Sequence, residues 1–161
     1  MSDVYDTVKR SEVMSRIRGR DNKSTEMKLA AAFRQCGVIG WRRQVPLKPR
    51  LAEEDQEPSM PSRRISVRPD FIFRANKVAV FVDGCFWHGC PQHAKMPVAN
   101  ASFWTKKLTG NMRRDQRATR ALQAAGWTVV RVWEHELTNP TVVTQRVLGY
   151  LSNKNQSPRA S

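Results

Sequence analysis

The segment from Arg68 to His93, RPDFIFRANKVAVFVDGCFWHGCPQH, restricts the folds open to this chain more than any other stretch. It holds two short apolar runs rich in β-branched and aromatic residues, Phe71–Phe73 and Val78–Val82, which predict two strands. The Ala-Asn-Lys triplet between them is typical of a hairpin turn. The sequence therefore predicts neighbouring strands, with Asp70 at the start of the first and Asp83 at the end of the second.

Two carboxylates at one end of a sheet predict a site for a divalent cation. Magnesium prefers carboxylate oxygens and also accepts backbone carbonyls, such as that of Val82. For a lone aspartate, a turn residue at a strand end would be the simpler interpretation. The residues that follow Asp83 favour a functional site instead, and we expect magnesium at Asp70 and the Val82 carbonyl.

A group of metal-binding residue types comes directly after the second strand. Cys85, Cys90 and His93 have the spacing C-x4-C-x2-H. Thiolate and imidazole ligands at such a spacing suit tetrahedral zinc. The alternative is a pair of buried cysteines beside a surface histidine. We expect a structural zinc site.

A tetrahedral zinc site needs a fourth ligand. The remaining candidates are His88, Cys36 and His135. His135 follows the apolar run Trp127–Trp133, which predicts a buried strand that could lie in the same sheet. We therefore assign His135 as the fourth ligand.

The stretch Thr25–Gln35 predicts a helix that Ser24 caps and that ends before Gly37. Its apolar residues recur at helical spacing and form one inward stripe: Leu29, Ala32, Phe33 and Cys36. Cys36 is accordingly expected in the core. Glu26 lies in the first turn, where the helix dipole favours a carboxylate.

The remaining chain completes an α/β pattern. Trp41–Leu47 predicts a first strand, and residues 48–67 predict a loop, which is either an inert insertion or a flap that contacts the substrate. Further helices are expected over Phe103–Ala125 and from Pro140 to Leu151. The order helix, three strands, helix, strand, helix indicates a mixed sheet flanked by helices.

The predicted long helix has an apolar side and a basic side. The apolar side consists of Trp104, Leu108, Met112, Leu122 and Ala125. The cations are Lys106, Lys107, Arg113, Arg114, Arg117 and Arg120, against the single acid Asp115. A solvated face is the usual meaning of such charges, but this imbalance also indicates phosphate contacts.

The overall charge points the same way. The 161 residues include 28 Lys and Arg against 14 Asp and Glu, a formal net charge of +14 that favours a polyanionic partner.

No apolar run reaches the roughly 20 residues of a membrane span, and the first residues lack an apolar signal core. Three cysteines, two of them in the zinc-like group, indicate a reducing cytoplasm. We expect a basic arm over residues 1–22, one domain over 23–151 and a disordered tail over 152–161.

Several motifs together resemble one family. PDF, VDGCFWHGCPQH, FW, NMRRD, GW and VWEHEL, in this order, are similar to the very-short-patch-repair (Vsr) mismatch endonucleases of the restriction-endonuclease-like superfamily. The resemblance covers Thr7 to Leu151 with one insertion. It implies a restriction-endonuclease-like core and magnesium-dependent nicking of one DNA strand beside a T:G mismatch, as in the repair of deaminated 5-methylcytosine. It also implies a bacterial, nucleoid-associated enzyme that acts as a monomer on DNA, with downstream repair proteins as further partners.

The resemblance assigns roles to individual residues. His88 matches a histidine that activates water, and Glu26 matches a glutamate that supports the metal site. Asp83 occupies a position that can be histidine in the family, so it either ligates the metal or orients the water. Three aromatic residues would wedge between base pairs beside the mismatch: Phe86, Trp87 and Trp104. The basic helix face would contact DNA.

Two other functions stay open. The chain could be a zinc-stabilised DNA-binding module without catalysis, or a related restriction endonuclease. The acidic residues and His88 favour an enzyme over a binding module, because a binding module has no use for them. The aromatic wedge favours mismatch recognition over cutting of intact duplex.

Overall fold

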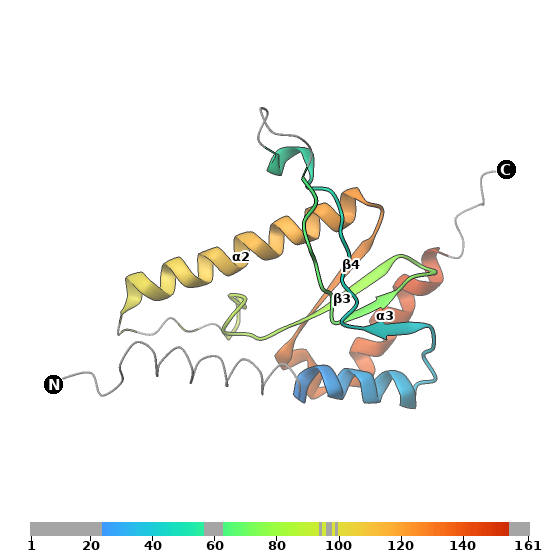
Figure 1. The fold of residues 1–161 in the computed structure, drawn as a ribbon. Coiled ribbons are helices and arrows are strands. Elements are labelled where there is room, and N and C mark those ends of the chain that lie inside the picture. The colour runs from blue at the N-terminus through green and yellow to red at the C-terminus, as the bar shows by residue number, and fades with distance from the viewer. Residues whose placement is uncertain (1–23, 57–62, 94, 96–97, 99, 155–161) are drawn as a thin grey trace.

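The computed structural model describes residues 24–56, 63–93, 95, 98 and 100–154, which build a four-stranded sheet with helices on both faces (Figure 1). The chain first forms a helix over residues 24–35, which we call the N-terminal helix. The elements that follow are β1 (Trp41–Arg43), the 3-10 turn η1 (Glu53–Asp55), β2 (Phe71–Phe73), β3 (Val78–Asp83), α2 (Ala101–Ala124), β4 (Thr128–Trp133), the 3-10 turn η2 (Glu134–Thr138) and α3 (Pro140–Lys154). The predicted order of helices and strands is confirmed.

The sheet is mixed, as predicted, with the strand order β1-β2-β3-β4. The pairs β1–β2 and β2–β3 are antiparallel, whereas β3 and β4 run parallel. The parallel pair requires a crossover, and α2 supplies it. Asp83 pairs with Trp133 at the carboxyl end of the parallel ladder, so the segments that follow β3 and β4 start side by side.

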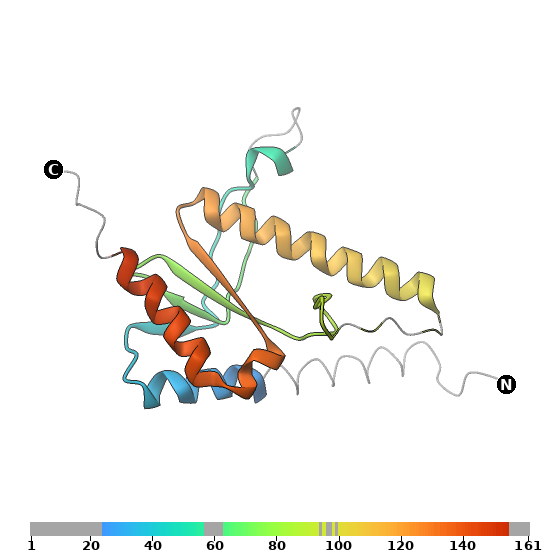
Figure 2. The same cartoon turned by 180° about the vertical axis from the view of Figure 1, so that it is seen from behind.

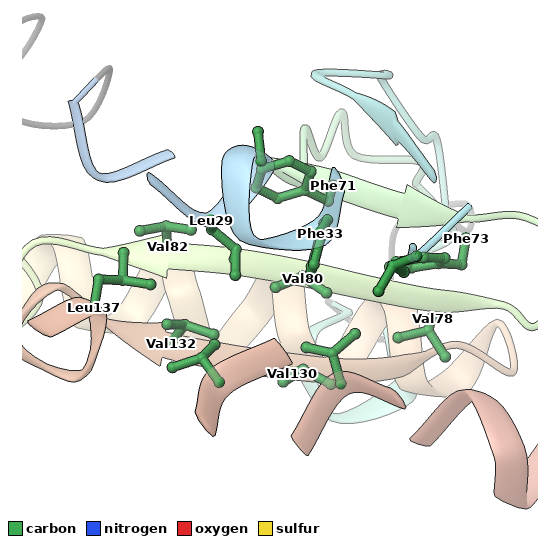
Figure 3. Packing of buried hydrophobic residues seen from close by; sticks show 14 residues of the cluster. Leu29, Phe33, Phe71, Phe73, Val78, Val80, Val82, Val130, Val132 and Leu137 are labelled. Atoms are coloured by element: carbon green, nitrogen blue, oxygen red, sulfur yellow. The ribbon is translucent and has the colours of Figure 1, made fainter. Parts of the chain in front are cut away.

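One face of the sheet carries the main core, which the N-terminal helix and α3 cover (Figures 2 and 3). Leu29 and Phe33 from the N-terminal helix lie against β2 and β3, and Phe33 contacts the rings of Phe71 and Phe73 edge-on at 5.2 and 5.8 Å. Alternate residues of each strand face this core because side chains alternate across a sheet. Val143 and Val147 of α3 are buried in the same core.

The hydrophobic cluster on the opposite face of the sheet is smaller and lies under the carboxyl-terminal half of α2. Ile72 and Ala79 of the sheet pack there with Leu122 of α2 and with Val67. The amino-terminal half of α2 projects beyond the sheet, over the segment that follows β3 (Figures 1 and 2). The helix thus links the core to the part of the molecule that holds the predicted metal ligands.

Several expectations about single residues are wrong. Cys36 is exposed rather than buried, because the N-terminal helix ends before it and the chain turns at Gly37 (φ +65°). Ser24 already lies inside the helix, so it is not the cap. On α2, Met112 is 40% exposed and Ala125 is exposed, whereas the polar Asn111 is buried.

Three segments also differ from their predicted form. The first strand ends at Arg43 rather than at Leu47. Residues 48–56 and 63–67, predicted as a loop, contain η1 and two bridges of an antiparallel ladder, Leu47 with Val67 and Arg50 with Arg64. The last helix continues to Lys154, into the stretch expected to be a disordered tail. The expected basic arm, residues 1–22, lies outside the described residues.

Within the described part of the chain, no helix is both long and apolar enough to cross a membrane.

Candidate active site and metal cluster

The predicted site residues meet at one end of the sheet, where β2 begins and β3 ends. Asp70 precedes Phe71, and Asp83 is the last residue of β3. Because β2 and β3 are antiparallel, these two ends lie at the same edge. The sequence alone predicted this placement, and the structure confirms it.

Asp70 is held by hydrogen bonds from two neighbours. The backbone N–H of Val82 donates to Asp70 Oδ2 at 2.7 Å, and the side-chain amide of Gln44 donates to Oδ1 at 2.9 Å. The N–H and C=O of one strand residue point to the same side, so the Val82 carbonyl is directed toward β2 and Asp70. Burial raises the pKa of Asp70 to about 6 against these hydrogen bonds, and the negative charges of Glu26 and Asp83 add to the rise.

Glu26 is buried at 5% exposure on the N-terminal helix and forms an ion pair across to β1. Arg43 Nη2 lies 2.7 Å from Glu26 Oε1, and Arg43 Nε donates to the same oxygen at 2.8 Å. Gln44, the next residue, contacts Asp70. The last residue of β1 and the residue that follows it therefore hold both carboxylates at this end of the sheet.

His88 lies between two carboxylates. Its Nδ1 is 2.6 Å from Asp115 Oδ2 and 3.6 Å from Asp83 Oδ1. Burial alone would lower the pKa of His88, but the hydrogen bond with Asp115 and the charges of Asp83 and Asp115 outweigh it and raise the pKa. An imidazole whose Nδ1–H donates to a carboxylate has its Nε2 free to accept a proton.

Asp83 is almost fully buried at 3% exposure and is paired with a cation from β4. Arg131 Nη1 donates to both oxygens of Asp83, at 2.9 and 2.7 Å. Arg131 Nη2 also donates to the backbone carbonyl of Asp115 at 3.2 Å. Asp83 thus belongs to the group that surrounds His88, and Arg131 joins the sheet to α2.

These groups line a hollow of about 350 Å³ on the α2 side of the sheet. Its wall includes Asp83, His88, Asp115, Arg120 and Arg131. A hollow of this size with convergent polar groups is typical of a small active site.

The four expected zinc ligands are brought together, although about fifty positions separate His135 from Cys85. The ligand atoms of Cys85, Cys90, His93 and His135 all lie within 4.8 Å of one another. Cys85 Sγ is 3.2 Å from His135 Nδ1, and Cys90 Sγ is 3.7 Å from His135 Nδ1 and 3.8 Å from His93 Nδ1. Ligands bound to tetrahedral zinc at 2.0–2.3 Å stand roughly 3.3–3.8 Å apart. The cluster therefore has the donor set of a metal site, and three of its separations are close to those of tetrahedral zinc.

The turn η2, which carries His135, is fixed from three directions. Glu134 accepts a hydrogen bond from the backbone N–H of Cys85 at 3.3 Å. Glu136 accepts one from the Trp133 N–H at 2.7 Å, and Arg146 of α3 contacts Glu136 at 2.6 Å. These contacts hold His135 against the two cysteines.

Phe86, Trp87 and Trp104 form an aromatic cluster. The ring centroid of Phe86 lies 5.1 Å from that of Trp87 and 5.4 Å from that of Trp104. Trp104 is buried at 9% exposure, whereas Phe86 and Trp87 are half-buried. Asn111 of α2 donates to the Trp87 carbonyl at 3.0 Å, which ties the segment after β3 to the projecting half of α2.

The expected phosphate-contacting residues of α2 are exposed along the helix. They are Lys106, Lys107, Arg113, Arg114 and Arg117. Arg120, which the sequence placed with them, is instead engaged by Asp55 at 2.6 Å.

Four residues of the site were not predicted from the sequence: Arg43, Gln44, Asp115 and Arg131. Each acts through a partner that is distant in the sequence, so no local spacing identifies it. Asp115 alone carried a signal, because it is the single acid on a helix face with six cations.

Similarity to known proteins agrees with this geometry. The family described as DNA mismatch endonuclease Vsr matches residues 59–94. The chain is 33% identical over 149 residues to the DNA mismatch endonuclease Vsr of Escherichia coli (strain K12), covering 92% of this chain and 83% of that protein. It is 31% identical over 149 residues to the type II nicking enzyme V.NmeAIP of Neisseria meningitidis serogroup A, covering 91% of this chain and 92% of that enzyme.

A more similar but shorter match is to the type II nicking enzyme V.NaeI of Lentzea aerocolonigenes. It is 53% identical over 72 residues and spans 45% of this chain and 43% of that enzyme, less than half of either. The full-length similarity to the two other relatives extends over the sheet, the site and the flanking helices. The chain belongs to the Vsr family of DNA endonucleases.

Proposed function

We propose that this protein is a magnesium-dependent endonuclease that nicks one strand of duplex DNA beside a T:G mismatch. The observation that carries the proposal is the arrangement around Asp70. This carboxylate accepts a hydrogen bond from the Val82 N–H at the end of the sheet, and His88 with its partner Asp115 lines a hollow that also includes Asp83. Hydrolysis of a phosphodiester needs a cation for the phosphate charge and a base for water, and these residues supply places for both.

Asp70 and the Val82 carbonyl would hold the magnesium ion, with Glu26 in support. The donor set fits a hard cation, because it consists of oxygen atoms. The charges fit as well, since Glu26 and Asp83 have arginine partners whereas Asp70 has none among the described residues. The raised pKa of Asp70 reflects burial and this uncompensated charge, which a divalent cation would neutralise. When bound, the ion would polarise the phosphate and stabilise the charge of the departing oxygen.

His88 would act as the base that takes a proton from water. Asp115 accepts a hydrogen bond from Nδ1, which orients the ring and leaves Nε2 as the accepting atom. Asp83 adds negative charge near Nδ1 and is itself held by Arg131. These two contacts support a role for Asp83 in positioning His88 rather than in binding the metal.

Zinc is the metal that best fits the Cys/His cluster, because two thiolates and two imidazoles favour it over magnesium or calcium. The ion would be structural, since all four protein ligands would be used and no open position would remain for substrate. It would fix the segment with Phe86 and Trp87 beside His88.

The aromatic cluster supports recognition of a mismatch. Inserting a side chain between base pairs costs a few kcal/mol of unstacking, and the cost is lower where pairing is already faulty. Phe86 and Trp87 remain half-exposed at the end of the molecule that carries the site. The names of two relatives, type II nicking enzymes, support cutting of one strand. A non-catalytic DNA-binding module and a related restriction endonuclease are the alternatives that the following experiments separate.

Replacing Asp70 with Ala tests the proposed reaction. We expect Asp70→Ala to lose nicking of T:G duplex in magnesium by about a thousandfold or more, because several kcal/mol of charge stabilisation depend on the bound cation. DNA binding should be largely kept. Single-turnover nicking on T:G duplexes with varied flanks, and on matched duplex, measures both activity and preference. Glu53→Ala, which removes an exposed carboxylate, serves as the control. Full activity of Asp70→Ala at saturating magnesium would refute the proposal.

The paired His88 and Asp115 can be tested independently of metal binding. We expect His88→Ala to lower the nicking rate by about 10²- to 10⁴-fold, as for loss of a general base. Asp115→Asn should also lower the nicking rate, because it misorients the imidazole of His88. The DNA affinity and the melting temperature of this variant should be unchanged. Gln123→Ala, at an exposed position of the same helix outside the hollow, is the control. Normal turnover in Asp115→Asn, together with a strong defect in His88→Ala, would show that Asp115 does not position the base.

Metal analysis of purified protein tests the zinc site. We expect one equivalent of zinc per chain and its loss in His135→Ala, with a lower melting temperature because metal binding and folding are coupled. Cys36→Ser should keep the metal, since Cys36 is exposed and distant from the cluster. The assignment is wrong if less than about half an equivalent is found, or if Cys36→Ser rather than His135→Ala releases the ion.

Trp87 tests recognition of the mismatch. We expect Trp87→Ala to reduce cleavage of T:G duplex much more than nonspecific binding, which the basic surface supplies. Trp41→Ala, a half-buried tryptophan packed on Phe33, should instead lower stability without changing the preference for mismatched DNA. Nicking rates and thermal unfolding are measured on both variants. A stability loss of about 3–5 kcal/mol in Trp87→Ala with an unchanged preference would make Trp87 a packing residue.

A further inference from the structure

Residues on either side of the gap at 57–62, between β1 and β2, form a two-stranded ribbon that extends the sheet. Trp41 pairs with Phe73 in the β1–β2 ladder, and the bridges Leu47 with Val67 and Arg50 with Arg64 continue it in the same register. Two backbone hydrogen bonds between Leu47 and Val67 measure 2.7 and 2.9 Å, and Leu51 N–H donates to the Arg63 carbonyl at 2.8 Å. We call residues 47–51 and 63–68 the ribbon. It rises past the carboxyl-terminal half of α2 (Figure 1).

The ribbon has an apolar side and a basic side, because side chains alternate along each strand. Leu47, Ile65 and Val67 pack in the cluster under α2. The intervening cations are exposed: Lys48, Arg50, Arg64 and Arg68. In the described part of the chain, the arginines that form ion pairs are Arg43, Arg120, Arg131 and Arg146. The four cations of the ribbon are not among them, so no carboxylate neutralises the ribbon cations there.

A charged contact fixes the ribbon to α2. Asp55, in the turn η1 beyond the first ribbon strand, accepts hydrogen bonds from Arg120 Nη2 at 2.6 Å and Nε at 2.9 Å. Such two-point contacts between arginine and carboxylate fix geometry as well as charge. Arg120 also lines the hollow that contains His88 and Asp115. The ribbon is therefore attached to the same helix that forms one wall of the active site.

The basic side starts at the active site. Arg68 comes two residues before Asp70, and the ribbon leaves the sheet where Gln44 pairs with Asp70. At about 3.4 Å per residue, the distance from Arg68 to Arg64 is roughly 14 Å. One DNA strand rises about 3.4 Å per nucleotide, so this distance corresponds to about four nucleotides. Lys48, Arg50 and Arg64 also border an open hollow of about 440 Å³ beside the end of α2, which leaves them accessible to a ligand.

We propose that the basic side of the ribbon binds phosphates of the DNA duplex next to the cleavage site. A ribbon that is inert would have no need for four exposed cations that form no ion pair in the described part of the chain. A protein partner with an apolar surface would find little here, because the apolar side is already packed against α2. The inference rests on the proposed DNA substrate, and it adds a second contact surface to the basic face of α2.

The salt dependence of DNA binding tests the ribbon without any cleavage. Each phosphate contact contributes about 0.9 to the slope of log affinity against log salt. We expect the double variant Arg50→Gln, Arg68→Gln to reduce the magnitude of this slope by about 1.8. Between 50 and 200 mM salt, the factor by which the variant loses DNA affinity should then be about twelvefold smaller than the factor for the unchanged protein. Measurements use T:G duplex without divalent cation, so that no strand is cut.

The matched control is Arg74→Gln with Lys77→Gln, which removes the same charge from the turn between β2 and β3, at the far end of β3 from Asp83. We expect this variant to keep the original slope. Equal slopes for the ribbon variant and the unchanged protein, or equal reductions in both variants, would overturn the proposal. If the ribbon variant has a lower melting temperature, Lys48→Gln with Arg50→Gln repeats the test. If the unchanged protein does not nick DNA but the ribbon variant still has a smaller slope, the proposed reaction is refuted, whereas the proposed contact between the ribbon and DNA is supported.

Discussion

The parallel pairing of β3 and β4 is the constraint on which the rest of the site depends. Val82 and Val132 are buried side by side, and the register carries Asp83 next to Trp133. The two chain segments that follow therefore start at the same edge. This pairing alone brings the histidine after β4 to the cysteines after β3. Without it, neither the Cys/His cluster nor the bridge from Arg131 to Asp83 could form.

The distribution of charge at this edge follows from the cost of burying carboxylates. A buried charge is stable when it has a partner, and removing that partner is costly. Glu26 has Arg43 and Asp83 has Arg131, each at 2.7 Å. Asp70 has only neutral donors among the described residues. Of Glu26, Asp70 and Asp83, Asp70 is thus the carboxylate without a cationic partner in the described part of the chain, which is the arrangement that a divalent cation would complete.

The helix α2 connects this site to the surfaces that we propose to bind DNA. Asp115 contacts His88, Asn111 donates to the Trp87 carbonyl, and Arg120 holds Asp55 in the turn η1 next to the ribbon. The exposed cations lie on other faces of the same helix. A single helix therefore sets His88, the aromatic cluster and the ribbon relative to one another, so that contacts to DNA on either side would act on one site.

The sequence by itself determined the strands around Asp70 and Asp83, the order of elements, the Cys/His ligand set and the resemblance to the Vsr family, because short-range periodicity and close spacing carry these features. It could not place Cys36, whose exposure depends on where the helix ends, or show that residues 48–67 contain a ribbon, whose pairing joins distant residues. The partners Arg43, Asp115 and Arg131 were decided only by the tertiary structure. Each meets its carboxylate or histidine across a long stretch of sequence, and only the packing of helices on the sheet brings them within hydrogen-bonding distance.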